Sequence, residues 1–302
     1  MNVKKILTQA IQKLEKFNIK TANLDAEILL FYTIKKSREF ILTHSEHKLT
    51  ESQITNFNSL IKKRSKGNPV AYLMGHKEFY GLDFLVNKDV LIPRPETELM
   101  IDEVLNFISH ISRPMSFIDI GTGSGCIIIS LIKQLLTFNF QLSTFNFFAT
   151  DISKNALVVA RKNAKKHKVK IKFLEGNLLE PFFENHKLSN PKNPIIITAN
   201  LPYLTPSQLK NSLSIKKEPK IALVAGSDGL KYYEELFKQI KLLVTSYPSN
   251  SAGKQLQITI FCEIDPQQKI KIGTLIKKEL PNSSFQIKKD LNGHSRLVIV
   301  KF

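Results

Sequence analysis

The feature that most constrains the fold is an alternation of strand-like and helix-like segments that begins near residue 115. Short runs of branched and aromatic apolar residues alternate with longer segments of helical periodicity. Strands are expected at Ser116–Ile120, Asn146–Thr150, Val169–Leu174, Ile195–Ala199, Gln255–Glu263, Phe285–Ile287 and Leu297–Val300. Helices are expected at Cys126–Leu136, Ser153–His167, Gly229–Val244 and Pro266–Leu280. This order predicts an α/β fold with a mostly parallel sheet covered by helices on both faces.

The end of the chain predicts one departure from a purely parallel sheet. Only Lys288 to Arg296 separate the last two expected strands, which is too short for a helical crossover. These strands are therefore expected to pair antiparallel, so that the last strand of a mixed sheet runs against its neighbour.

The first part of the chain carries helical patterns and no catalytic constellation. Thr50 with Gln53 three residues later is typical of a capping box at the start of a helix. Short apolar runs from Phe79 to Val86 and at Val90–Ile92 indicate strands of a hairpin or linker. The expected parts are a helical substrate-docking domain over residues 1–68, a β-hairpin linker over 69–92 and a catalytic domain over 93–302.

Charge and composition exclude several classes of protein. The net charge is +18, but 38 lysines against 6 arginines are spread along the whole chain, so charge alone predicts no specific nucleic-acid partner. No run approaches about 18 apolar residues, so no membrane-spanning helix is expected. Two separated cysteines, Cys126 and Cys262, and seven histidines without ligand spacing predict neither disulfides nor a metal site. With no secretory leader visible, a cytoplasmic location is expected. The protein is also expected to be a monomer.

A glycine-rich loop follows the first strand of the alternating region. It comprises Gly121, Thr122, Gly123, Ser124 and Gly125, with Asp119 two residues before it. Such glycines allow a tight turn and a close approach of the backbone to a ligand. Position 126 is Cys rather than the third glycine of the dinucleotide fingerprint. The loop resembles the S-adenosylmethionine loop of class I methyltransferases, in which the backbone and Asp119 could orient the ligand's ammonium and carboxylate. A glycine-rich turn without a ligand is the alternative.

Polar residues also follow the next two expected strands. Asp151 can accept hydrogen bonds from both hydroxyls of a ribose, or it can belong to the N-cap of the next helix. The segment with Asn177 and Leu178 lies at the strand end where methyltransferases of this kind usually have an acidic residue. That acid contacts the adenine amino group of the cofactor. Asn177 could accept that hydrogen bond through its amide oxygen, and Leu178 could contact the ring.

The tetrapeptide Asn200-Leu201-Pro202-Tyr203 follows the fourth strand and predicts the reaction. An amide nitrogen is a poor nucleophile, so its methylation needs hydrogen-bond acceptors for the NH2 group and alignment with the methyl donor. Asn200 offers a side-chain oxygen, and Leu201 or Pro202 a backbone carbonyl. Pro202 fixes the backbone, and Tyr203 offers a flat aromatic wall. A proline-containing turn without a ligand is the alternative, which the position of the motif in the alternating sheet disfavours.

This tetrapeptide resembles the Asn-Pro-Pro-Tyr signature of methyltransferases that act on planar nitrogens. Further stretches are similar to the peptide chain release factor N(5)-glutamine methyltransferases, the PrmC/HemK family, and they extend over the whole chain. They are Val70–Leu73, Phe79–Gly81, Val90–Glu98, Glu218–Leu223, Gly226–Leu230 and Asp290–Arg296.

The resemblance implies a fold, a donor and a substrate. The fold is a Rossmann-like methyltransferase domain behind a small helical domain. The donor is S-adenosyl-L-methionine, with S-adenosyl-L-homocysteine as product, and the substrate is the glutamine of the Gly-Gly-Gln loop of release factors. Leu201 stands where proline is commoner, and we expect activity to survive because only its backbone is needed. Alternatives are a methyltransferase acting on nucleic-acid exocyclic amines, one acting on a ribosomal-protein glutamine, and a catalytically idle binding protein.

Overall fold

In a computed structural model of the chain, residues 1–109, 111, 113–138, 140, 142–184, 193–211, 215–246 and 256–302 are described. The chain separates into two units, one of Met1–His76 with Ser212–Lys217 and one of Lys77–Asn211 with Glu218–Phe302. The division falls at the first residue of a short strand, and each unit has its own apolar core.

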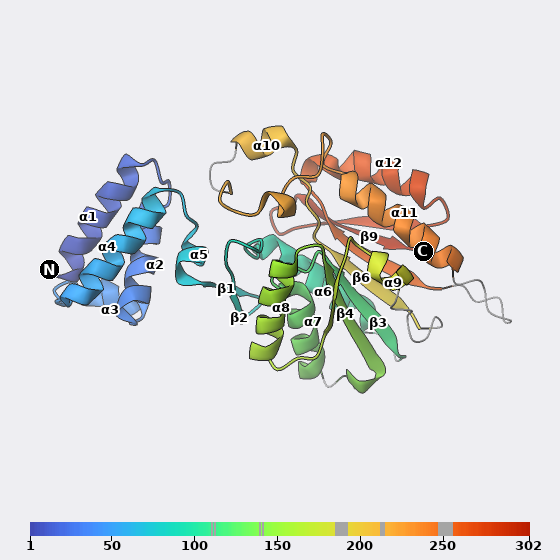
Figure 1. The fold of residues 1–302 in the computed structure, drawn as a ribbon, viewed down its shortest axis with the longest axis horizontal. Coiled ribbons are helices and arrows are strands. Elements are labelled where there is room, and N and C mark those ends of the chain that lie inside the picture. Colours follow the sequence, from blue (N-terminus) through green and yellow to red (C-terminus); the bar gives the residue numbers. More distant parts are fainter. Residues whose placement is uncertain are drawn as a thin grey trace. The chain divides into compact units, whose positions relative to one another are not determined.

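The first unit is helical (Figure 1). Its helices are α1 (Val3–Lys16), α2 (Ala22–Ile34), α3 (Arg38–Thr43), α4 (Glu51–Ser65) and α5 (Val70–Met74). Leu14, Leu30 and Phe57 are among the fully buried residues that join them. The capping box of α4 is confirmed, since Gln53 N donates to Thr50 Oγ1 (3.2 Å) and Thr50 N donates to Gln53 Oε1 (2.9 Å).

A two-stranded sheet of β1 (His76–Phe79) and β2 (Leu82–Leu85) opens the second unit. The strands are joined at Tyr80 and Gly81, which both have positive φ (52° and 70°). The expected strand at Val90–Ile92 is wrong, because these residues lie in a loop. The backbone N–H of Ile92 donates to the side chain of Glu218 (3.1 Å) rather than to a neighbouring strand.

The main sheet has seven strands. They are β3 (Met115–Ile120), β4 (Phe145–Asp151), β5 (Lys172–Glu175), β6 (Ile195–Ala199), β7 (Ile258–Glu263), β8 (Ser284–Lys289) and β9 (Ser295–Lys301). Their spatial order is β5-β4-β3-β6-β7-β9-β8, and β3 to β7 pair parallel. Strand β9 runs antiparallel to both of its neighbours, which confirms the expected mixed sheet with an antiparallel last strand.

Helices cover both faces of this sheet (Figure 1). One layer contains α6 (Glu98–Ile108), α7 (Cys126–Thr137) and α8 (Lys154–Lys166), and the other contains α9 (Glu180–Glu184), α11 (Lys231–Ser246) and α12 (Lys269–Glu279). The remaining short helices are α10 (Pro206–Asn211) and the 3-10 turns at Pro95–Thr97, Leu142–Thr144, Lys220–Ala222 and Pro266–Gln268. Neighbouring strand residues alternate between the layers, as Phe117 packs with the first and Ile118 with the second.

The expected elements differ from the observed ones mainly at their ends. Strand β5 starts at Lys172 instead of Val169, because only four of its residues pair with β4. Strand β7 starts at Ile258, and the expected first residue, Gln255, lies outside the described residues. Among the helices that the structure describes, none combines the length and the apolar composition needed to cross a bilayer.

Candidate functional site

A cavity opens at the carboxyl ends of the parallel strands, where the strand order reverses. From β3 the chain moves outward to β4 and β5, and it later returns to place β6 on the other side of β3. Such a reversal leaves a crevice beyond the strand ends. Gly121, Asp151, Asn177 and Asn200, which follow or end four successive strands, all line this cavity.

The glycine loop after β3 needs its glycines. Gly121, Gly123 and Gly125 have φ of +67°, +55° and +81°, a region that side chains rarely adopt. A Cβ on Gly125 would lie 2.9 Å from Ile129 Cδ1, whereas one on Gly123 would meet no atom nearer than 3.9 Å. Gly123 is therefore open toward the cavity. Four of the five candidate loop residues line it, namely Gly121, Thr122, Gly123 and Ser124, and Gly125 starts helix α7 behind them.

Asp119 anchors this loop through hydrogen bonds to its side chain. Its carboxylate is fully buried and accepts hydrogen bonds from Thr122 Oγ1 (2.6 Å) and Thr198 Oγ1 (2.8 Å). Burial raises the pKa of Asp119 to about 6, against the effect of the two hydroxyl donors. Asp119 does not line the cavity, so the structure gives it an anchoring position rather than the ligand contact that the sequence suggested.

Asp151 presents an oriented carboxylate to the cavity. Gly123 N donates to its Oδ2 (2.9 Å) and Ser153 N donates to its Oδ1 (2.8 Å). Burial raises the pKa of Asp151, and these two backbone donors act in the opposite direction. Ser153 itself caps helix α8 by accepting from Ala156 N (3.2 Å). Each oxygen of Asp151 therefore keeps a lone pair for a ligand such as a ribose diol.

Asn177 lies in the same cavity with its amide group held by acids. Its Nδ2 donates to Glu235 Oε1 (2.5 Å) and to Glu180 Oε1 (3.3 Å). The amide oxygen is thus the atom available to an adenine amino group. Leu178, also in the lining, has a positive φ of 54° and is almost fully buried.

The tetrapeptide after β6 divides into two parts. Asn200, Leu201 and Pro202 line the cavity, and Tyr203 does not. The Tyr203 carbonyl accepts from Gln268 Nε2 (3.0 Å), and burial raises the pKa of its phenol above the usual range. The aromatic wall expected of Tyr203 therefore stays a prediction.

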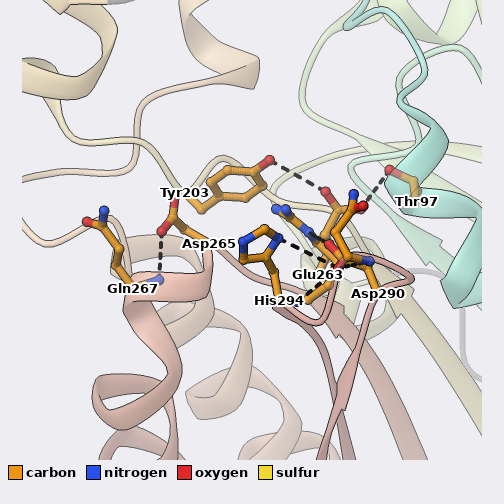
Figure 2. A network of polar contacts seen from close by, with 9 residues as sticks. Thr97, Tyr203, Glu263, Asp265, Gln267, Asp290 and His294 are labelled. Atoms are coloured by element: carbon orange, nitrogen blue, oxygen red, sulfur yellow. Dashed lines mark hydrogen bonds and ion pairs between the residues drawn. The ribbon is translucent and has the colours of Figure 1, made fainter.

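The sequence assigned no individual role to Thr97, Glu263, Glu235 or Arg94. All four contact or neighbour the expected site residues. Figure 2 shows Thr97 and Tyr203 turned toward Glu263 from separate elements. One signal existed: Glu263 is the last residue of an apolar strand, at the same sheet edge as Asp151 and Asn200.

Further lining residues of the cavity come from segments that are distant in the sequence. Pro93, Arg94 and Thr97 are among them. Ile221, Ala222 and Tyr232 also line the cavity and, like Leu178, add apolar surface. A flat heterocycle could rest against this apolar part while its polar groups reach Asp151 and Asn177.

Comparison with known proteins gives matches over both units. A family model described as the PrmC N-terminal domain matches residues 5–75, and one described as a methyltransferase domain matches residues 111–279. The release factor glutamine methyltransferase of Bacillus subtilis (strain 168) is 32% identical over 90% of this chain and 89% of that protein. That of Buchnera aphidicola subsp. Acyrthosiphon pisum is 34% identical over 100% of this chain and 99% of that protein.

Among solved structures, the hMettl16 catalytic domain in complex with the MAT2A 3'UTR hairpin 1 is similar to this chain. The match has a TM-score of 0.54 and 14% identity, and covers 90% of each chain. At this identity the similarity concerns the fold alone.

Proposed function

The chain belongs to the release factor glutamine methyltransferase family, and on this basis we propose that it methylates the glutamine of the Gly-Gly-Gln loop of translation release factors. The methyl group is transferred to the side-chain amide nitrogen of that glutamine. Asn200 carries the proposal, because it places a side-chain amide beside Pro202 in the cavity wall, within reach of the cofactor loop. We further propose that the protein works as a cytoplasmic monomer without a specific nucleic-acid partner.

S-adenosylmethionine is the methyl donor; its sulfonium carries an electrophilic methyl group and leaves as a neutral thioether. The residues present suit this molecule. The open backbone at Gly123 and its neighbours Gly121, Thr122 and Ser124 can face an amino-acid end. Asp151 would accept from the ribose hydroxyls, and Asn177 with Leu178 would meet the adenine.

At the acceptor side, the chain's own oxygens would orient the substrate amide. The two hydrogens of an amide NH2 need two acceptors, which Asn200 Oδ1 and a backbone carbonyl of Leu201 or Pro202 can supply. Held in this way, the nitrogen is kept at the distance and angle needed for in-line transfer. A strong general base is unnecessary if the proton leaves after the methyl group has been transferred.

The proposal is tested by mass spectrometry of release factors incubated with the protein and S-adenosylmethionine. We expect one added methyl group on the peptide that contains the Gly-Gly-Gln glutamine. Parallel incubations with ribosomal proteins, RNA and DNA test the other acceptors. Methyl transfer to one of these in place of the release factor would overturn the proposal.

One variant should separate binding of the acceptor amide from binding of the cofactor. Asn200→Ala is expected to abolish methylation and leave the affinity for S-adenosylhomocysteine, measured by calorimetry, largely unchanged. The reason is that we assign Asn200 to the acceptor amide, and Asp151 and the glycine loop to the cofactor, although all of them line one cavity. Equal loss of both properties would contradict this division of roles.

A further inference from the structure

A series of hydrogen-bonded polar side chains runs from Asn200 through Thr97 to Glu263. Asn200 Nδ2 donates to Thr97 Oγ1 (3.1 Å), and Thr97 Oγ1 donates to Glu263 Oε2 (2.6 Å). Thr97 and Glu263 are each only 2% exposed. The three residues come from the turn before α6, the end of β6 and the end of β7, and Figure 2 shows Thr97 facing Glu263.

The direction of these bonds follows from proton counting. A threonine hydroxyl has one hydrogen, and an ionised carboxylate can only accept. The hydrogen of Thr97 is therefore directed to Glu263, and toward Asn200 the same oxygen can only accept. An acceptor at that point requires the NH2 group of Asn200, so Asn200 Oδ1 must point the other way.

We propose that Thr97 and Glu263 are positioning residues that lock the Asn200 amide in the orientation that presents its oxygen to the substrate nitrogen. This inference rests on the proposed function, since it assumes that the substrate is an amide NH2. In the reversed orientation the NH2 of Asn200 would face the NH2 of the substrate. Two donors would then oppose each other in a buried site, where an unpaired polar group is costly.

This orientation of the Asn200 amide depends on the negative charge of Glu263. Burial raises the pKa of Glu263 to about 7, and the charge of nearby Glu96 acts in the same direction. The hydroxyls of Thr97 and Tyr203 and the guanidinium of Arg296 act in the opposite direction. Tyr203 OH lies 3.5 Å from Glu263 Oε1, and Asp265 and Arg94 contribute to the field around this phenol.

Protonation of Glu263 would reverse the direction of the hydrogen bonds that join Glu263, Thr97 and Asn200. A neutral carboxylic acid can donate to Thr97 Oγ1, which frees the hydroxyl hydrogen for the oxygen of Asn200. Asn200 would then turn its NH2 toward the substrate. The turnover of the wild-type protein should therefore fall as the pH drops through about 7.

The first test compares Thr97→Val with Thr97→Ser. Valine keeps the shape and loses the hydroxyl, and we expect kcat on a release factor to fall about ten- to a hundredfold. Serine keeps the hydroxyl and should restore kcat to within about threefold. The affinity for S-adenosylhomocysteine should be unchanged in both. Thr259→Val, the same exchange at a buried position of β7, is the control and should leave kcat unchanged.

The second test uses Glu263→Gln and the pH profile of kcat. The wild-type profile should show a transition near pH 7, and the variant, whose amide does not titrate in this range, should lack it. Identical profiles would overturn the proposal. Wild-type kcat in Thr97→Val would also overturn it.

A readout without turnover separates this inference from the proposed function. The side-chain NH2 resonances of Asn200, assigned by their loss in Asn200→Ala, should shift in Thr97→Val and keep their wild-type position in Thr259→Val. Unshifted resonances in Thr97→Val would overturn the inference. A wild-type protein that does not methylate release factors would instead contradict the proposed function, and the resonance test would still decide on the orientation of Asn200.

Discussion

Glu218 forms an ion pair with Arg94, 124 residues earlier in the chain. The Glu218 side chain is 2% exposed and that of Arg94 is 32% exposed. The second oxygen of Glu218 accepts from the backbone N–H of Ile92 (3.1 Å). One carboxylate thereby fastens the wall at Pro93 and Arg94 to the segment that contributes Ile221 and Ala222 to the same cavity.

Glu218→Gln should therefore weaken the connection between two segments that line the cavity, the one with Pro93 and Arg94 and the one with Ile221 and Ala222. We expect the free energy of unfolding to fall by about 1–2 kcal/mol. The loss is modest because Arg94 is partly exposed, so water replaces part of its interaction with the carboxylate. We also expect weaker binding of S-adenosylhomocysteine. Urea unfolding and calorimetry measure the two effects. Glu234→Gln removes the exposed ion pairs with Lys238 and Lys278 and should change neither property. Equal effects of the two exchanges would contradict the role assigned to Glu218.

Asp151→Ala should weaken cofactor binding. It removes the carboxylate that Gly123 N and Ser153 N orient toward the cavity, and we expect the dissociation constant for S-adenosylhomocysteine to rise about ten- to a hundredfold. The control is Glu175→Ala, at the end of the neighbouring strand β5, whose side chain lies outside the cavity lining. Similar losses in both variants would show that Asp151 has no particular role.

Gly125→Ala and Gly293→Ala separate backbone strain from packing. Both glycines have φ near +80°, so an alanine is strained at either position, by about 1 kcal/mol or more. A Cβ on Gly293 would meet no atom within 4 Å, whereas one on Gly125 would approach Ile129 Cδ1 (2.9 Å) and Ala160 Cβ (3.4 Å). We expect Gly125→Ala to cost about 1–3 kcal/mol more in unfolding experiments. Equal costs would mean that the loop can shift to admit a side chain.

The sheet could be predicted from the sequence because its central strands are buried on both faces. Such strands appear as unbroken apolar runs, as at Ile195–Ala199, where the expected and observed bounds agree. The error at Val90–Ile92 has the same origin. An apolar run also looks like a strand when it lines a cavity, and the carboxylate that holds it, Glu218, is more than a hundred residues away.

The site was predictable only where a residue follows a recognisable strand. Asp151 and Asn200 could be found for this reason, and both line the cavity. Thr97 precedes a helix and resembles an ordinary capping residue. Its contact with Glu263 joins positions 166 residues apart, which no local pattern reveals.

Asp119 should make the stability of the fold depend on pH in a defined direction. Its pKa is raised from 3.8 to about 6 because its carboxylate is fully buried beneath the glycine loop. Folding therefore favours its protonated form. The stability that this preference contributes is fully present below pH 3.8 and is lost as the pH rises through about 6.

Asp119→Asn removes this contribution, because asparagine is neutral at every pH. We expect the free energy of unfolding of the wild-type protein, minus that of the variant, to decrease between about pH 4 and about pH 7. Urea unfolding at several pH values measures the difference. A difference that rises with pH would mean that the hydroxyl groups of Thr122 and Thr198 outweigh burial and keep the carboxylate charged at lower pH.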